Sequence, residues 1–371
     1  MTNPQASPPL RVPAADAVQP DQPCQWWYWS GNLRAASGRR FGFQLAFFAA
    51  EAVRGLLWGQ MVHFALVDVE AQRFVARSRV WLGAPRRIVD RFALASPGGE
   101  AQAWGGGGED RLVLRGEGSC LDLRASGGPL ALHYEGRSHA YAFGGSSYYY
   151  SRTAMQARAR LHLDGRDEAL QGEVWFDRQF GELMPALCEG WQWCSLHLES
   201  GEQLMVFGFE RTPDERFAAH TDRQGRTRWL RGDAIGLEVV ETWRSDATGI
   251  AYPAAWRLTT PDHALLVRAC PAAQEMAGRR WWGPVYWEGA CEVSGSARGQ
   301  GYVELLGAAA PALARLRARV PALVEHPALG LGLATVVGRA SARLASLRPR
   351  FDGPAWSGLV HERPAARHRA A

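Results

Sequence analysis

The sequence lacks lysine: all 42 basic residues among its 371 positions are arginine. Without a lysine amine, the protein cannot form a Schiff base with a carbonyl substrate. It also lacks the lysine that a Walker-type phosphate loop requires. The composition therefore excludes two large classes of enzyme chemistry before any motif is considered.

Several features typical of secreted, membrane and metal-binding proteins are also missing. The six cysteines include no C-x-x-C pair, which indicates free thiols in a reducing cytosol. No run of about 18 apolar residues is present, so no transmembrane helix is predicted. The N-terminus has no apolar core of a signal peptide. We therefore expect a cytoplasmic protein.

Metal and hydrolase motifs are equally scarce. The histidines of the body are scattered singly, without H-x-H or H-E-x-x-H spacing. There is no G-x-S-x-G elbow to hold a nucleophilic serine. We expect no metal site and no cofactor.

The excess of positive charge lies at the C-terminal end. The net charge is +5, and residues 309–371 hold ten arginines against three acids. The rest of the chain is therefore slightly acidic and carries no basic footprint for nucleic acid. Apolar residues from Leu313 to Val324 recur at helical spacing between arginines. We predict a basic, partly helical tail that packs on the body or anchors the protein peripherally on the inner face of a membrane.

Short alternating or apolar runs, broken by Gly, Asp and Ser, dominate the body of the chain. Examples are "RFGFQLAFFAA", "QMVHFALVDVE" and "CSLHLESGEQLMVFGFE". Many strands at this spacing, with few helical stretches between them, predict an all-β protein of antiparallel barrel or sandwich type. The segment "GELMPALCEG" interrupts the pattern. The expected division is an extended Pro-rich lead-in (1–23), two β domains (24–185 and 186–308) and the tail (309–371).

The stretch "GEVWFDRQFG" places an aspartate, Asp177, among aromatic residues. Residues two apart in a strand face the same side, so Trp175 shares a face with Asp177, and Tyr148 shares one with Tyr150. If these faces meet inside a barrel, Asp177 lies in an aromatic box. Desolvation would then raise the pKa of Asp177 and keep it protonated near neutrality. Such an acid could protonate a C=C bond, and ring faces would stabilise the resulting cation.

A structural role for Asp177 stays open at this point. Arg178 or Arg152 could hold it in an ion pair, where it would remain ionised. Glu288 and Glu304 are acids inside apolar strands; they either face outward, pair with arginine, or supply a second carboxylate.

Further aromatic residues are candidates for the wall of a pocket. Trp191 and Trp193 share one strand face and belong either to the core or to a ligand pocket. Tyr286 and Tyr302 could donate hydrogen bonds to a ligand or to the protein itself. We include all four among the predicted substrate-binding residues.

A family resemblance rests on eight segments in a fixed order. They are "CQWWYWSGNL", "GRRFGFQLAFF", "SYYYSRT", "GEVWFDRQFG", "GWQWCSLHLESGEQLMVFGF", "TGIAYPAAWRL", "YWEGACEVSG" and "GYVELLG". In this order they resemble the lipocalin-like family that contains carotenoid 1,2-hydratase (hydroxyneurosporene synthase), the AttH-type proteins and the fungal lipocalin-like Diels–Alderases. The resemblance covers roughly residues 24–307. It implies two lipocalin-like β domains with a cavity within or between them.

The resemblance also implies roles for particular residues. Asp177 falls on the acid that is thought to protonate an alkene in the hydratase branch, and Trp175 on its strand neighbour. Tyr148 and Tyr150 fall on partner positions of the preceding strand, one of which is a histidine in the hydratases.

The sequence departs from the hydratase pattern at two further positions. Gln25 replaces the usual acid before the Trp pair, and Arg178 replaces the usual histidine after the motif aspartate. The chain is closer to the AttH-type branch than to the hydratase branch.

Residues and resemblance together predict a cofactor-independent enzyme, a lyase or cyclase. It would carry out acid-initiated hydration or cyclisation of C=C bonds in a large hydrophobic polyene, isoprenoid or polyketide. Two alternatives stay open. One is a pericyclase that acts mainly by positioning its substrate. The other is a non-enzymatic, lipocalin-like carrier of an apolar small molecule.

Overall fold

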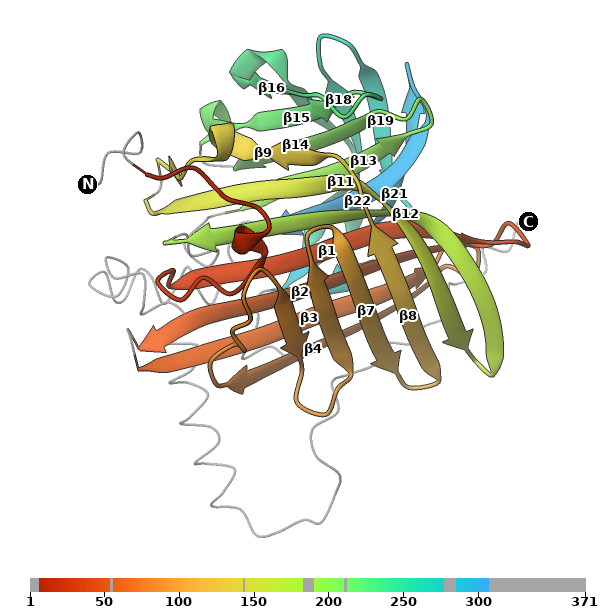
Figure 1. Ribbon diagram of the computed structural model, residues 1–371. Coiled ribbons are helices and arrows are strands. Elements are labelled where there is room, and N and C mark those ends of the chain that lie inside the picture. Colours follow the sequence, from red (N-terminus) through yellow and green to blue (C-terminus); the bar gives the residue numbers. More distant parts are fainter. Residues whose placement is uncertain are drawn as a thin grey trace, which may run out of the picture.

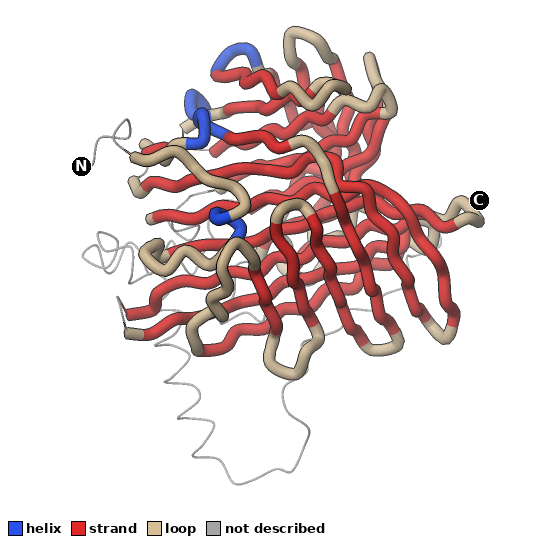
Figure 2. The backbone as a smooth tube through the Cα atoms, viewed as in Figure 1, coloured by secondary structure: helices blue, strands red, loops and turns tan. Residues whose placement is uncertain are grey.

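Two antiparallel β-sheets make up the protein in a computed structural model that describes residues 7–53, 56–142, 144–182, 190–209, 212–276 and 285–306. Figure 1 shows the two sheets, and Figure 2 shows that strand accounts for most of this backbone. The helices found in the described ranges are short 3-10 turns: η2 (Ala14–Asp16), η3 (His133–Gly136), η5 (Pro213–Glu215) and η6 (Gly232–Ala234). The all-β prediction is confirmed.

The first sheet has 12 strands, in the order β4-β3-β2-β1-β12-β11-β8-β7-β6-β5, with β9 and β10 also paired to β11. Its strands are β1 (Cys24–Ala35), β2 (Arg40–Val53), β3 (Leu57–Asp68), β4 (Arg73–Leu82), β5 (Phe92–Ala95), β6 (Ala101–Gly106), β7 (Glu109–Gly116), β8 (Ser119–Ser126), β9 (Leu130–Leu132), β10 (His139–Ala140), β11 (Ser146–Leu163) and β12 (Arg166–Gly181).

The second sheet has 10 strands, in the order β16-β15-β14-β13-β22-β21-β19-β18-β17, with β20 paired to β21. Its strands are β13 (Trp191–Leu198), β14 (Gln203–Phe209), β15 (Phe217–Thr221), β16 (Thr227–Arg231), β17 (Gly236–Arg244), β18 (Ala251–Thr259), β19 (Ala264–Ala269), β20 (Glu275–Met276), β21 (Tyr286–Gly295) and β22 (Gly299–Leu306).

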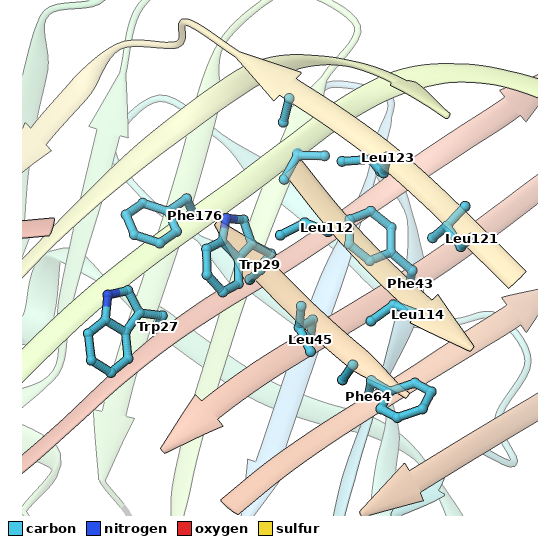
Figure 3. Close-up of a cluster of buried hydrophobic side chains, with 14 of the residues drawn as sticks. Trp27, Trp29, Phe43, Leu45, Phe64, Leu112, Leu114, Leu121, Leu123 and Phe176 are labelled. Carbon is cyan, nitrogen blue, oxygen red and sulfur yellow. The ribbon is translucent and has the colours of Figure 1, made fainter. Parts of the chain in front are cut away.

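The first sheet curls around its own hydrophobic core (Figure 3). Trp27 and Trp29 on β1 and Phe43 on β2 point into this core and are fully buried. Leu112 on β7 and Leu123 on β8 complete it, although β12 and β11 separate them from β1 in the sheet. Each such side chain contributes about 1.5–3 kcal/mol when fully buried. The shared core therefore holds the sheet in a half-barrel, and the second sheet encloses a core of its own in the same way.

The N-terminal lead-in differs from the extended segment that its prolines suggest. Ala14–Asp16 form η2, and the Asp16 side chain is fully buried inside the first half-barrel. Arg152 on β11 donates to both Asp16 carboxylate oxygens, at 2.8 and 2.9 Å. The Tyr150 hydroxyl and the Gly107 amide also donate to Asp16. A buried carboxylate with this many donors fixes the segment in place.

The two half-barrels pack against each other through the faces opposite their own cores. A mixed cluster joins them, with Tyr28 from β1 and Trp193 from β13 among its members. The approach is close, because a Cβ placed on Gly42 of β2 would lie 2.9 Å from the Ala290 Cβ on β21. The interface between the sheets therefore has little spare room, and it contains the candidate site.

Other features bear on the remaining predictions. The five cysteines of the described ranges are free thiols. In those ranges, no helix has the length and apolar character needed to cross a membrane. The tail (309–371) lies outside the described residues, so its helices and its proposed membrane contact stay predictions.

Candidate active site between the two sheets

A cavity of about 60 Å³ lies between the two half-barrels. Strands β1, β2, β11 and β12 of the first sheet and β13, β14, β21 and β22 of the second surround it. Its lining is mostly aromatic, with one alanine and four polar side chains: Trp26, Tyr28, Ala46, Phe48, Tyr149, Asp177, Gln179, Trp191, Trp193, Phe207, Phe209, Tyr286, Glu288 and Glu304. A space of this size holds a few waters or a short piece of a substrate.

Asp177 lies in the cavity wall, near the end of β12. Its side chain is buried, with 4% exposed. The Tyr149 hydroxyl donates to Oδ2 at 2.7 Å, and the Trp175 indole N–H donates to Oδ1 at 2.7 Å. The Ser151 hydroxyl also donates to Oδ1. All three donors are neutral groups.

The ion pair that was the structural alternative for Asp177 is not formed. Arg152 binds Asp16 on the other side of β11. Arg178 donates to the backbone carbonyls of Ala15 and Ala17 at 3.2 and 2.8 Å. None of the ion pairs found within the described ranges includes Asp177.

Burial governs the protonation of Asp177. Desolvation raises the pKa of this carboxyl from its ordinary 3.8 to about 7, while the three neutral donors act in the opposite direction. A carboxyl with a pKa near 7 holds its proton for a substantial fraction of the time at neutral pH. That range is the one in which a general acid works best.

Strand parity places Tyr148 and Tyr150 away from Asp177, contrary to the expectation from the sequence. Ser151 on β11 lies directly opposite Asp177 on β12, so Tyr149 and Ser151 share its face. Tyr148 and Tyr150 point into the first half-barrel, and they pack in its core. The geometric prediction was wrong by one residue, which in a strand exchanges the two faces.

A buried histidine that sequence reasoning missed lies behind Asp177. His133 in η3 has its Nε2 2.8 Å from the Ser151 hydroxyl oxygen, and the Trp229 indole N–H donates to its Nδ1 at 3.4 Å. Burial lowers the pKa of His133 to about 3, so the ring is neutral. Because Nδ1 accepts, we assign the proton to Nε2, which then donates to Ser151. A chain of hydrogen bonds thus runs from His133 through Ser151 to Asp177.

Two more carboxyls face the cavity from the second sheet. Glu288 on β21 and Glu304 on β22 are directly opposite each other in the strand pairing. Burial raises the pKa of both, and the charge of Glu304 raises that of Glu288 further. Two adjacent buried carboxylates cannot both ionise easily, so the pair retains a proton at neutral pH. Both side chains face inward, as the second-carboxylate alternative required.

The other predicted aromatic residues are brought together at this interface. Trp193 donates its indole N–H to the Tyr149 hydroxyl at 3.1 Å, which extends the network around Asp177. Trp191 is half-buried and lines the cavity. The Tyr286 hydroxyl lies 2.6 Å from Nδ1 of the buried His63.

Two of the predicted substrate-binding residues, Trp175 and Tyr302, do not line the cavity. Tyr302 belongs to the same buried cluster, and its hydroxyl has no hydrogen-bond partner within the described ranges. Trp175 is fully buried and acts as a donor to Asp177.

The two departures from the hydratase pattern contact each other. The Arg178 guanidinium donates to the Gln25 side-chain oxygen at 2.9 Å. It also lies over the Trp27 ring, 3.9 Å from the centroid. These residues line the inside of the first half-barrel, away from Asp177. The departures therefore change how the lead-in is held and leave the face of the candidate site unaltered.

A larger, open hollow of about 970 Å³ lies over β5–β7, and Asp110 borders it. Burial raises the pKa of Asp110 to about 6, but the nearby Arg152 guanidinium favours its ionised form. Four arginines line the hollow: Arg86, Arg91, Arg111 and Arg124. It lacks the enclosed aromatic walls that an apolar reacting group needs, so we place the candidate site at Asp177.

The chain is an all-β protein of two curled antiparallel sheets with a buried acid between them. A model of the AttH-like family matches residues 3–308, and the chain therefore belongs to the AttH-like family. An AttH protein from Nitrosomonas europaea is 26% identical, covers 83% of this chain and 100% of its own, and superposes with a TM-score of 0.70. No match was found among curated proteins.

Two more distant solved structures are also similar to this chain. Kievitone hydratase from Nectria haematococca is 16% identical and covers 82% of this chain and 95% of its own, with a TM-score of 0.66. CghA with Sch210972 covers 81% of this chain and 96% of its own at 12% identity, with a TM-score of 0.40. The first of these supports the fold alone, and the second is too distant to support an argument.

Proposed function

We propose that the protein is a cofactor-independent enzyme that adds water, or an internal nucleophile, to a C=C bond of a hydrophobic substrate. One observation carries the proposal: Asp177 is a buried carboxyl that faces an aromatic cavity and is bound by neutral donors alone. A carboxyl held in this way can keep its proton at neutral pH and release it to an apolar acceptor.

The residues of the cavity can perform each step of such an addition. Neutral Asp177 gives its proton to one alkene carbon, and the other carbon becomes a cation. The rings of Tyr28 and Trp193, packed edge to face with their centroids 5.2 Å apart, line the cavity where this charge develops. Water or a substrate hydroxyl then forms the new bond to carbon. Its proton passes to Asp177, which released one in the first step.

The hydrogen-bonded chain behind Asp177 supports its repeated use. Ser151 and His133 link the carboxyl to Trp229, whose side chain is 37% exposed. Ser151 and His133 thereby help to orient the carboxyl, with Oδ1 bound by Ser151 and Trp175 and Oδ2 by Tyr149 alone. We assign them a positioning role.

The size of the cavity limits what can react inside it. A volume of about 60 Å³ is far below the roughly 300–1,000 Å³ of pockets that enclose a drug-sized ligand. The reacting double bond and a water fit, whereas the rest of a polyene, isoprenoid or polyketide would lie at the mouth. Half-buried Trp26, Phe48 and Trp191 provide apolar surface there.

The same size argues against the two alternatives. A carrier must enclose most of its cargo, and a pericyclase must hold a folded polyene along its reacting length. The carboxyls are also unnecessary for either role, and because burying three of them lowers stability, their presence favours a function that uses them. Acid–base addition accounts for both features.

The test is product formation from a panel of hydrophobic alkenes and polyenes in ¹⁸O-labelled water. Hydration incorporates the label, and cyclisation gives an isomer of unchanged mass. We expect Asp177→Asn to reduce the rate by about 10²–10⁴-fold, the usual contribution of a general acid. Asp122→Asn, which alters a partly exposed acid paired with Arg111, is the control and should keep full activity. Undiminished turnover by the Asp177→Asn protein would overturn the proposal.

A further inference from the structure

Folding brings two isolated histidines and a glutamate together at one end of the second half-barrel. Glu202 lies in the turn before β14, His220 on β15, and His263 in the turn before β19. One ligand atom from each lies within 4.8 Å of the others. Their spacing in the sequence matches no metal-binding motif, because the proximity arises from strands that pair far apart in the chain.

The donor atoms of these side chains are available to a common point. The His220 Nε2 is 3.2 Å from a Glu202 oxygen. The His263 Nε2 is buried and has no hydrogen-bond partner within the described ranges. A buried imidazole nitrogen without a partner is unfavourable unless a ligand uses it. The side chains of Glu202 and His220 are 24% and 11% exposed, which leaves a route from solvent.

The surroundings resemble those that orient metal ligands. Ser200 donates to the second Glu202 oxygen at 2.7 Å. An Asp262 oxygen lies 3.6 Å from the His220 Nδ1, where a small movement would let it accept a hydrogen bond from Nδ1–H once Nε2 binds a metal. Arg228 forms an ion pair with Asp262 and donates to the same Nδ1 at 3.3 Å, a contact that must give way when Nδ1 takes up the ring proton. Its charge is thus partly neutralised by the residue that would support the ligand.

We propose that Glu202, His220 and His263 form a binding site for a divalent first-row metal ion such as Zn²⁺. Two imidazoles and one carboxylate are a recurring ligand set for Zn²⁺ and for similar ions, and they leave positions for water. Small side-chain rotations would shorten the present separations to those of ligands bound at about 2.0–2.2 Å. The protein would hold the ion from three separate segments of the second sheet.

The position of the site gives the ion a mechanical consequence. β14 and β15 lie on one side of the second sheet, and β19 lies on the other, with β13, β22 and β21 between them. An ion held by His220 and His263 would connect the two sides across the curl. It would therefore favour the folded state and raise the unfolding temperature.

Zn²⁺ and Co²⁺ are the probes for a test on the chelator-treated full-length protein. We expect one equivalent of Zn²⁺ by calorimetry, a visible Co²⁺ absorption band, and a Zn²⁺-dependent rise in unfolding temperature. Glu202→Gln, His220→Asn and His263→Gln should each weaken Zn²⁺ binding by at least about tenfold and remove the thermal shift. Asp262→Asn should weaken it within the roughly 10–100-fold range of outer-shell partners.

His162→Ala is the matched control. His162 lies on the surface with Asp167 at 2.8 Å, so it offers a histidine–carboxylate pair without a third ligand. This variant should bind Zn²⁺ like the unchanged protein. The proposal is overturned if the unchanged protein binds no Zn²⁺, or if the three ligand variants bind it as well as His162→Ala does. Circular dichroism without metal identifies any variant that fails to fold; the His263→Gln variant, whose side chain is partly exposed, then carries the test.

Discussion

Replacing Asp177 by Asn should make the protein more resistant to unfolding at alkaline pH, relative to the unchanged protein, while it slows the proposed chemistry. Asn keeps the shape of the side chain and can accept from Trp175 and Ser151, but it does not titrate. In the unchanged protein, burial raises the pKa of Asp177 from 3.8 to about 7 in the folded state. The folded state therefore holds the proton more tightly than the unfolded state does.

The sign and size of the effect follow from this shift. The stabilising contribution of a raised pKa is fully present below about pH 3.8 and is lost as the pH rises to about 7. Each pKa unit corresponds to about 1.36 kcal/mol. Between pH 5 and 8.5, the unchanged protein should lose about 2–3 kcal/mol of unfolding free energy relative to the Asp177→Asn variant.

Urea denaturation followed by circular dichroism at pH 5 and pH 8.5 measures this change. Comparing the two proteins at both pH values cancels groups that titrate equally in each, and it also cancels any fixed loss of a hydrogen bond. Asp122→Asn is the control, because its paired arginine lowers the pKa of Asp122 and both states stay ionised over this range. A pH-independent gap between the Asp177→Asn variant and the unchanged protein would refute a raised pKa at this site.

Two further predictions separate the faces of the central strands. Tyr149→Phe removes a donor that lowers the pKa of Asp177. The alkaline limb of the pH–rate profile should therefore shift to higher pH by on the order of one pH unit. Tyr150→Phe removes the same group from the neighbouring residue, but it should leave that limb unchanged and cost about 1–3 kcal/mol of stability, because Asp16 loses a donor. Equal shifts of the pH–rate limb would contradict the face assignment. Arg178→Met removes the donor to the buried carbonyls of Ala15 and Ala17. It should destabilise the fold by about 3–5 kcal/mol in urea denaturation and expose the lead-in to protease. An unchanged cleavage pattern would count against this role of Arg178.

The fold was predictable because alternating apolar and polar residues mark its strands and turn residues mark their ends. Asp164 and Gly165 follow β11 with φ values of 52° and 78°, the conformation that a tight hairpin requires and that the Asp-Gly pair favours. The segment "RFGFQLAFFAA" lies within β2 as its pattern indicates. The alternation of apolar and polar residues does not predict how strongly each sheet curves.

The candidate site was predictable only in part. Asp177 stood out because a carboxyl among aromatic residues demands an explanation. The sequence did not show which residues of the neighbouring strand share the face of Asp177. Three consecutive tyrosines at 148–150 place aromatic rings on both faces of β11. Ser147 and Ser151, each two residues from the middle tyrosine, mark the polar face and were the available clue. His133 carried no such signal, because its proximity depends on β9 pairing with β11.

The docked lead-in has a practical consequence for handling the chain. A version that starts at Cys24 would remove Asp16, the acid that Arg152 binds, and the carbonyl groups of Ala15 and Ala17 that Arg178 binds. Arg152 would then lose its buried ion-pair partner, and Arg178 would lose two of its acceptors. Trimming the proline-rich start to aid crystallisation would therefore damage the fold, whereas an affinity tag placed ahead of residue 7 would leave these contacts intact.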